Sequence, residues 1–322
     1  MNKALDLHAR YPVIDGHADS ILGYLDGKRK LSERSDQGHI DWPRGLEAKM
    51  ACTVQVAWPR PDWYPVAPKK IGEAVDAILR EVEAGGDDVV LALTGDHIRK
   101  VHAAGKLAVL INLEGAEAIQ GSLGLLRNYY RLGVRMMGLV WNHRNEVAEG
   151  VEESSGGGLT KFGREVIQEM NRLGMLIDLA HITPKGFYDV LELSQQPVLF
   201  THGNCKALFD HQRNLTDQQI KDLAAAGGVF GISIVGVFMG GLETADIYTV
   251  ADHIDHVVQV LGNADHVAYG TDFDGTRTLK GIEDVTKLPH LTAELLKRGY
   301  SEADMAKILG GNYLRVFDAV LR

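Results

Sequence analysis

The sequence predicts an α/β fold, and specifically a closed (β/α)8 TIM barrel. Three observations support this prediction: eight short apolar runs recur along the chain, helical stretches separate most of them, and the length of 322 residues suits one barrel. Strands that alternate with helices favour a parallel sheet, and eight such strands can close on themselves. A doubly wound open sheet is the alternative.

Each apolar run is bounded by polar or turn-forming residues, as expected for buried strands. The predicted strands are Pro12–Asp15, Cys52–Ala57, Ala108–Leu113, Arg135–Val140, Met175–Leu179, Val198–Phe200, Val229–Ile234 and Val267–Gly270. The stretches Gly72–Ala84 and Lys161–Leu173 have helical periodicity. For the second of these, Thr160 is a suitable N-cap and Gly174 a suitable stop.

The segments between these elements predict loops but no domain boundary. Asp26–Arg44 is rich in charge and glycine, and is expected to form a loop over one end of the barrel. Gly156–Gly158 is expected to be a second flexible loop. Because no linker, composition break or internal repeat occurs, residues 1–322 are predicted to form a single domain.

Composition restricts the classes of partner and the compartment. The chain is 45% hydrophobic and 24% charged, which is ordinary for a globular protein. Its formal net charge of −9 argues against nucleic acid or an anionic membrane as the main partner. Only Cys52 and Cys205 are present, no apolar leader starts the chain and no long apolar run occurs. These features predict a cytoplasmic protein with no membrane span.

The stretch "VIDGHADS" places His17 and Asp19 at the end of the first predicted strand. In an extended segment, residues i and i+2 point to the same side, so the two side chains would converge. One such pair is weak evidence, because a histidine at a strand end is more often a hydrogen-bonded turn residue.

Other predicted strands also end in residues that bind metals or move protons. These residues are Glu114, His181, His202 and Asp272. In a barrel, the C-terminal ends of all strands open on one face, so the six side chains would meet there. Coincidence at five strand ends is much harder to accept than at one. Asp15 and Asp274 are expected to be turn residues or to support the ligands.

The residue types indicate a site for two divalent metal ions. Imidazoles and carboxylates suit zinc and related ions. Five candidate ligands, His17, Asp19, Glu114, His181 and His202, exceed what one tetrahedral zinc with an open position needs. They suit two ions bridged by a carboxylate, and Glu114 is the natural bridge. Two neighbouring ions can share a hydroxide and clamp a carbonyl oxygen.

Taken together, the motifs resemble those of a known family, the renal (membrane) dipeptidases of the amidohydrolase superfamily, in the form of a bacterial-type soluble member. The resemblance covers nearly the whole chain. It is carried by "IDGHADS", "NLEGAEAI", "GLTKFGREVIQEMNRLGMLIDLAH", "PVLFTHGN", "DHQRNLTD" and "GTDFDG". The intervals from His202 back to His181 and forward to Arg213 also match the family.

The resemblance implies a role for each matching residue. His17 and Asp19 would hold one zinc ion, His181 and His202 the other, and Glu114 would bridge them. Asp272 would be the proton shuttle between the bridging water and the leaving amine. Arg213 would hold the terminal carboxylate of the substrate, because its planar fork suits a bidentate pair. A homodimer is also implied.

One family residue is absent. Many members carry a histidine after the fourth strand that polarises the scissile carbonyl, and Trp141 occupies that position in "GLVWNHRNEVAEG". Our hypothesis is that His143, two residues on, replaces it. The alternatives are the Asn142 amide, the indole N–H of Trp141, or polarisation by the metals alone. Loss of such a donor costs roughly 3 kcal/mol of transition-state stabilisation.

The resemblance implies a zinc-dependent dipeptidase that acts on small dipeptides, including those with a D-residue at the C-terminal position, through a metal-bridging hydroxide. One alternative is a metal-dependent amidohydrolase for a non-peptide amide or an N-acyl amino acid. Another is a non-hydrolytic metal-binding protein on the same scaffold. Substrate preference is expected to reside in Asp26–Arg44, Trp58–Pro68 and Val235–Tyr248. Trp58, Trp63 and Tyr64 either line the mouth or pack under these loops.

Overall fold

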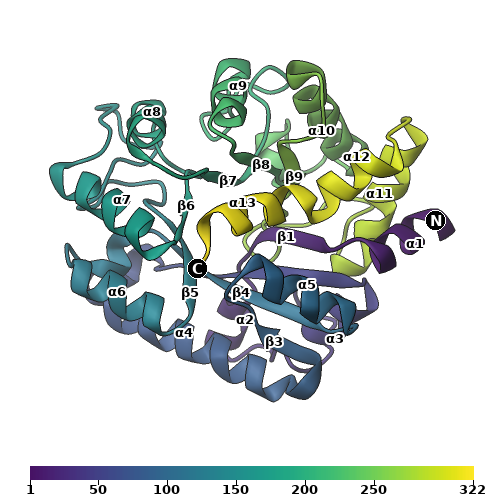
Figure 1. The fold of residues 1–322 in the computed structure, drawn as a ribbon, viewed down its shortest axis with the longest axis horizontal. Coiled ribbons are helices and arrows are strands. Elements are labelled where there is room, and N and C mark those ends of the chain that lie inside the picture. The colour runs from purple at the N-terminus through teal and green to yellow at the C-terminus, as the bar shows by residue number, and fades with distance from the viewer.

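Parallel strands close into a barrel in the computed structural model, which describes residues 1–322 (Figure 1). The barrel strands are β1 (Val13–Ala18), β2 (Met50–Ala57), β4 (Leu107–Glu114), β5 (Val134–Gly138), β6 (Leu176–Asp178), β7 (Leu199–Gly203), β8 (Val229–Ile232) and β9 (Val267–Tyr269). They follow one another around the ring in the order β2-β1-β9-β8-β7-β6-β5-β4, and pairing of β2 with β4 closes it. The predicted (β/α)8 fold class is therefore confirmed.

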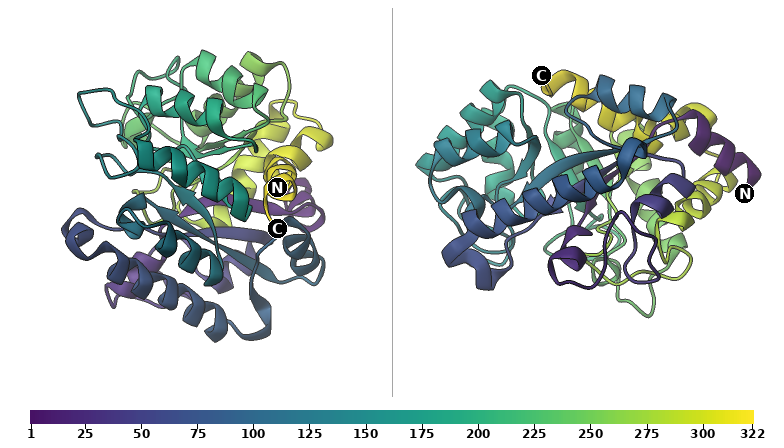
Figure 2. Two further views of the ribbon diagram at one scale, coloured as in Figure 1. Left: turned by 60° about the vertical axis from the view of Figure 1, so that its left-hand side comes forward. Right: turned by 90° about the horizontal axis from the view of Figure 1, so that it is seen from below.

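Helices surround the barrel on the outside (Figures 1 and 2). They are α1 (Asn2–Arg10), α2 (Ile21–Leu25), α3 (Trp42–Glu47), α4 (Ala67–Ala84), α5 (Gly95–Ala103), α6 (Leu123–Arg131), α7 (Lys161–Leu173), α8 (Pro184–Leu193), α9 (Asp217–Ala225), α10 (Ile247–Leu261), α11 (Leu288–Lys297), α12 (Glu302–Ala306) and α13 (Asn312–Val320). No helix combines the length and the apolar character that crossing a membrane requires.

The predicted elements agree with the observed ones in most places. Every predicted strand overlaps a barrel strand, and α7 has the predicted bounds. Its start is capped by Thr160 Oγ1, which accepts a hydrogen bond from the Gly163 amide at 2.9 Å. It ends at Gly174, whose φ of 72° favours glycine. The helix α4 starts at Ala67, earlier than predicted, because Pro68 is well suited to a first turn.

Two local features differ from the predictions. The short strand β3 (Val89–Leu91) was not predicted, and it pairs only with the start of β4, outside the closed ring. The expected loop Asp26–Arg44 is irregular as far as Asp41, where α3 begins. The right-hand view of Figure 2 shows this loop, in purple, on the side of the barrel away from α13.

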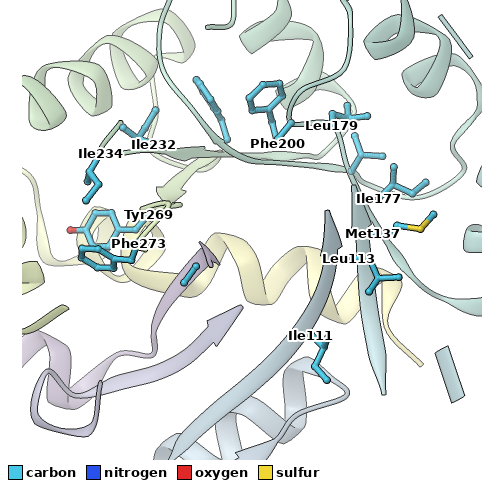
Figure 3. Close-up of a cluster of buried hydrophobic side chains, with 14 of the residues drawn as sticks. Ile111, Leu113, Met137, Ile177, Leu179, Phe200, Ile232, Ile234, Tyr269 and Phe273 are labelled. Atoms are coloured by element: carbon cyan, nitrogen blue, oxygen red, sulfur yellow. The ribbon is translucent and has the colours of Figure 1, made fainter. Parts of the chain in front are cut away.

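Alternation along the strands separates two layers of core. Ile111 and Leu113 of β4 belong to the large cluster that packs the strands against the helices (Figure 3). Leu110 belongs to a second cluster, which joins the opposite faces of the strands to α5 and α13. Because alternate residues of a strand share a face, Glu114 lies on the same side as Leu110, at the C-terminal end of the interior.

Helix α13 lies outside the strands, across the barrel end opposite to Glu114, and its Tyr313 side chain reaches into the interior. The hydroxyl of Tyr313 donates a hydrogen bond to the carbonyl oxygen of Tyr269 at 3.0 Å. Gly16 and Gly231 face this hydroxyl, and a Cβ atom on either glycine would collide with it. The barrel therefore has a packed apolar floor, and only its other end is free for polar groups.

The barrel closes where β1 meets β9. These strands share a single register pair, Asp15 with Tyr269. The buried Asp15 carboxylate reinforces the pair, since it accepts hydrogen bonds from the Thr271 hydroxyl at 2.6 Å and the Thr271 amide at 2.8 Å. Beyond this point, the Asp272 amide donates to the carbonyl of His17 at 3.0 Å.

Candidate metal centre and active site

Five predicted ligands converge at the C-terminal end of the barrel. Oε1 of Glu114, at the end of β4, lies 2.9 Å from His181 Nε2, 3.7 Å from His17 Nε2 and 3.7 Å from His202 Nε2. Asp19 Oδ2 is 3.6 Å from His17 Nε2. All five residues are buried. Side chains from the ends of three strands thus surround the carboxylate at the end of a fourth.

The chemistry of this cluster fits divalent cations. The Nε2 atom of His17 and Oδ1 of Asp19 are buried and have no hydrogen-bond partner. Ligand atoms lie within 4.8 Å of one another in three groups, two of which contain only predicted site residues: His17 with Asp19 and Asp272, and Glu114 with His181 and His202. The third joins His17 and His202 to Asp178. Such a set of nitrogen and oxygen atoms suits zinc and related ions. Since Glu114 reaches members of the first two groups, the residues fit two neighbouring cations.

Neighbouring side chains turn the imidazoles toward the centre. The Thr201 hydroxyl donates to Asp178 Oδ2 at 2.6 Å, so its lone pairs accept from His202 Nδ1 at 3.0 Å. Asn142 Oδ1 accepts in the same way from His181 Nδ1 at 2.7 Å. Both rings therefore carry their proton on Nδ1, which leaves Nε2 for a metal.

Asp178 was missed by the sequence reasoning. Besides the Thr201 hydroxyl, its carboxylate accepts hydrogen bonds from the amides of Ala180 and Thr201, both at 3.0 Å. It is buried at the end of β6 and orients the strand ends that carry His181 and His202. The signal was a carboxylate inside the apolar run "MLIDLAH", where a charge needs a specific partner.

Asn142 was predicted to contact substrate, but the structure gives its amide oxygen another role. That oxygen is hydrogen-bonded to His181, so the residue holds a ligand in position. The same polar contact fixes the ring plane of His181, whose backbone has a positive φ of 69°. Strained backbone of this kind is common at functional sites, where surrounding contacts hold it.

Charges in the cluster are mutually dependent. Burial raises the pKa of Glu114, and burial lowers the pKa of both His181 and His202. Burial also acts to lower the pKa of His17, but the carboxylates of Glu114 and Asp19 outweigh it and raise that pKa. Protons thus compete with metal ions for this site, so metal affinity is expected to fall as the pH falls.

Asp272 lies beside the ligands on a strained turn. Its φ is 64°. A carboxylate oxygen of Asp272 lies within 4.8 Å of potential ligand atoms of His17 and Asp19. A Cβ atom on Gly275 would collide with carboxylate oxygens of both Asp19 and Asp272, so these groups face the same small space. Burial, followed by the negative charge of Asp19, raises the pKa of Asp272. A raised pKa suits a carboxyl group that accepts and returns a proton.

A cavity of about 490 Å³ opens over the centre. Its lining includes Asp19, Glu114, His181, His202 and Asp272, together with Asp26, Lys28, Arg29, Trp58, Arg60 and Trp141. The first two loops expected to set substrate preference therefore contribute to its wall. No residue of the third, Val235–Tyr248, lines this cavity, and neither Trp63 nor Tyr64 does.

Trp141 forms part of an aromatic wall above the metal cluster. Its ring centroid lies 4.9 Å from that of Trp58 and 6.1 Å from that of His181. The indole nitrogen of Trp58 is buried and has no hydrogen-bond partner. Trp141 therefore borders the cavity, as its predicted role in substrate binding requires.

His143 does not reach the cavity, contrary to the hypothesis that it replaces the missing histidine. Its side chain is 45% exposed, and its Nε2 atom lies 3.8 Å from Glu152 Oε2. The strand β5 ends at Gly138, so residues 141–143 lie in a bend and the side-sharing of an extended segment does not apply.

Replacing His143 with alanine is accordingly expected to leave kcat/KM for the best substrate within about twofold of wild type. Steady-state rates on that substrate check this, with Trp141→Ala as the matched variant that alters the cavity wall. A tenfold or larger fall in kcat/KM for His143→Ala would show that His143 does take part in the reaction.

Arg213 is a buried cation with unused donors. Its Nη2 atom donates to the carbonyl of His202 at 3.3 Å, while Nε and Nη1 have no partner. Burial lowers its pKa to about 10, so it stays charged at neutral pH. It lines a neighbouring cavity of about 200 Å³ and not the larger one. A buried guanidinium with unpaired donors destabilises the folded protein unless an anion accepts hydrogen bonds from it.

Glu117, three residues after the central carboxylate, was also missed. It is buried, and neither of its oxygens has a hydrogen-bond partner of ordinary geometry, although the Asn145 amide lies near enough to lower its pKa slightly. Burial is the larger effect and raises the pKa of Glu117 from 4.5 to about 7. It lines a third cavity, together with Tyr64 and Asn145.

Glu117→Gln is expected to stabilise the protein at high pH. A carboxyl group with a raised folded-state pKa keeps its proton longer when folded, so rising pH between 4.5 and about 7 reduces stability. The variant avoids that loss and should be about 2 kcal/mol more stable than wild type at pH 8, with little difference at pH 4.5. Urea unfolding at both values checks this. An equal difference in stability between variant and wild type at pH 4.5 and at pH 8 would contradict this expectation.

Comparison with known proteins agrees with this geometry. The model of a family described as membrane dipeptidase, peptidase family M19, matches residues 1–322. A dipeptidase of Clonostachys rogersoniana, VerJ, is 35% identical over 339 aligned residues, which cover 99% of this chain and 87% of that protein.

Solved structures have the same fold. A dipeptidase and metallopeptidase of family M19 has a TM-score of 0.90 and 31% identity, over 97% of this chain and 99% of that one. A metallopeptidase of Rhodobacter sphaeroides, liganded with a phosphinate mimic of the dipeptide L-Ala-D-Ala, has a TM-score of 0.89 and 30% identity, over 96% and 99% of the two chains. The chain therefore belongs to the membrane dipeptidase family, peptidase family M19, whose members are metal-dependent hydrolases of peptide bonds.

Proposed function

We propose that this dipeptidase uses two divalent cations, most suitably zinc, to hydrolyse small dipeptides. The observation that carries the proposal is the convergence of three imidazole Nε2 atoms on Oε1 of Glu114. His17 and Asp19 would hold one cation, His181 and His202 the other, and Glu114 would contact both. Such ions, when bound, supply Lewis-acid chemistry that activates water and polarises the scissile carbonyl.

Asp272 is proposed to move the proton. Its carboxylate lies beside Asp19 and His17, at the edge of the cluster and in the wall of the cavity. From there it would take a proton from the attacking water and deliver it to the leaving amine. Burial and the negative charge of Asp19 raise its pKa, which favours a carboxyl group that holds the proton between these two steps.

Arg213 is proposed to bind the free carboxylate of the substrate. Its two unpartnered nitrogens offer a planar fork of the kind that pairs with a carboxylate. The guanidinium also bonds the backbone of His202, which ties this anion site to a proposed metal ligand. Since Arg213 lines the neighbouring cavity of about 200 Å³, a substrate held at both points would be short and would extend from the metal cluster toward that cavity.

A D-residue at the C-terminal position is part of the proposal. Its support is the Rhodobacter sphaeroides relative, which is liganded with a phosphinate mimic of L-Ala-D-Ala. Trp141, which forms an aromatic wall with Trp58, occupies the position where many family members have a histidine. In this chain, the cations and the Trp141 indole N–H would therefore polarise the carbonyl.

Initial rates of the zinc-loaded protein on matched L-Xaa-L-Xaa and L-Xaa-D-Xaa dipeptides test the proposal. The corresponding dipeptide amides and N-acyl amino acids serve as controls. We expect kcat/KM of about 10⁴ M⁻¹s⁻¹ or more on one dipeptide series, and a large loss on the amides, which lack the carboxylate. Preference for N-acyl amino acids would favour the broader amidohydrolase function instead. If protein with two bound ions hydrolyses none of these substrates, the result would favour a non-hydrolytic function.

A further inference from the structure

A buried arginine links the loop after β1 to the turn that carries Asp272. Arg29 Nη2 lies 2.6 Å from Asp274 Oδ2, and its Nη1 donates to the carbonyl of Ile40 at 2.6 Å. The Arg29 side chain is only 4% exposed. Arg29 and Asp274 both line the cavity over the metal cluster. This ion pair is therefore part of the cavity wall and is shielded from solvent.

The Asp274 carboxylate gathers contacts from separate segments. Besides Arg29, Oδ2 accepts from the Ser20 hydroxyl at 2.5 Å, and Oδ1 accepts from the His39 amide at 2.8 Å. In return, the Asp274 amide donates to His39 Nδ1 at 2.9 Å. One carboxylate thus joins the start of α2, two points of the loop after β1, and the turn after β9.

The loop is closely fitted around Arg29. Gly38 has a φ of 70°, and a Cβ atom there would collide with the Arg29 guanidinium. Gly38 also borders the cavity. The loop after β1, seen in purple in the right-hand view of Figure 2, is thereby fixed over the mouth by a charged group.

The turn that receives these contacts is strained. Asp272 and Asp274 have φ values of 64° and 68°, in the left-handed region that non-glycine residues rarely adopt. Within the turn, the Gly275 amide donates to the Asp272 carbonyl at 3.1 Å. The Asp272 carboxylate faces the Asp19 carboxylate across a small space, and the backbone of this turn sets the direction in which it points. A conformation of this kind persists only when surrounding contacts over-determine it.

We propose that Arg29 is a positioning residue for proton transfer. Through Asp274 it holds the turn 272–275 in the strained conformation that aims the Asp272 carboxylate at the reacting centre. Arg29 touches neither the ligands nor Asp272, and its effect passes through Asp274. The inference rests on the proposed role of Asp272 and adds a second requirement, that the loop after β1 be in place.

Arg29→Met removes the charge and keeps much of the side-chain volume. We expect it to lower kcat at least thirtyfold while KM changes less than threefold and two ions remain bound. Added guanidinium ion should restore part of kcat, because the vacated site borders the cavity. Arg34→Met is the matched control, since Arg34 belongs to the same loop and forms an exposed ion pair with Glu47. It should leave kcat unchanged.

Double variants separate positioning from other roles. If Arg29 acts through Asp272, Arg29→Met should cause no further loss in an Asp272→Asn background. An equal fractional loss in both backgrounds would overturn the proposal, as would an effect on KM alone. A fall in Tm with unchanged kcat would show a purely structural role.

Amide hydrogen exchange tests the proposal independently of catalytic rates. The amide of Gly275 should exchange faster in Arg29→Met and Asp274→Asn than in wild type or Arg34→Met. Unchanged exchange would overturn the proposal whatever the rates show. If the turn loosens as expected but Asp272→Asn retains full activity, the proposed role of Asp272 fails, and the link between Arg29 and the turn stands.

Discussion

Replacing Glu114 with alanine is expected to reduce bound metal from about two divalent ions per chain to one or fewer and to lower kcat/KM at least about 1000-fold. That loss corresponds to about 4 kcal/mol of transition-state stabilisation. The reason is geometric, because Oε1 of Glu114 lies within 3.7 Å of the Nε2 atom of each of the three proposed histidine ligands. Elemental analysis of protein purified without chelator, together with kcat/KM, checks both parts.

Glu117→Gln is the matched control for this experiment. It changes another buried glutamate only three residues away and outside the metal cluster, so it should keep both ions. Retention of two ions and of activity in Glu114→Ala would rule out a shared carboxylate. A stoichiometry of one ion in the wild-type protein would do the same.

Asp272→Asn should produce the second large effect, a fall in kcat of about 10²- to 10⁴-fold, the range typical of general acid–base catalysis. The amide has nearly the shape of the carboxyl group but cannot carry the proton from water to the leaving amine. We expect KM to stay within about threefold, since the proposed substrate anchor is Arg213. Rates measured with saturating dipeptide, alongside metal analysis, check this result.

Asp26→Asn is the control for Asp272→Asn. Asp26 also lines the cavity, but its carboxylate is paired with Lys28 and Arg60 at the rim. It should retain kcat. Loss of bound metal in Asp272→Asn would instead show that Asp272 is a metal ligand. Bound metal should be measured because the Asp272 carboxylate lies within 4.8 Å of potential ligand atoms of His17 and Asp19.

The fold and the metal cluster were predictable because both depend on position along strands. A strand end is visible as the point where an apolar run meets a polar residue, and the barrel places all such ends on one face. Hence His17, Glu114 and His202 could be found from the sequence. The strand β3 was missed because it lies outside the ring and pairs with only the start of β4.

Residues outside the strands were harder to place. The interpretation of His143 and Asn142 assumed that extended backbone continues past Val140, whereas β5 ends at Gly138 and the chain bends. In the bend, Asn142 turns toward His181 and His143 turns toward solvent. Arg29 and Asp274 are 245 residues apart in sequence, and no local pattern relates them.

The sparse pairing between β1 and β9 has a consequence for how the protein folds. The two strands share one register pair, yet His17 and Asp19 come from one side of this junction and Asp272 from the other. In a nascent chain, the first proposed ligands therefore precede by some 250 residues the final strand that completes the ring around them. Metal capture and completion of the ring are thermodynamically linked, so cations that bind across the junction will favour the closed ring over open intermediates.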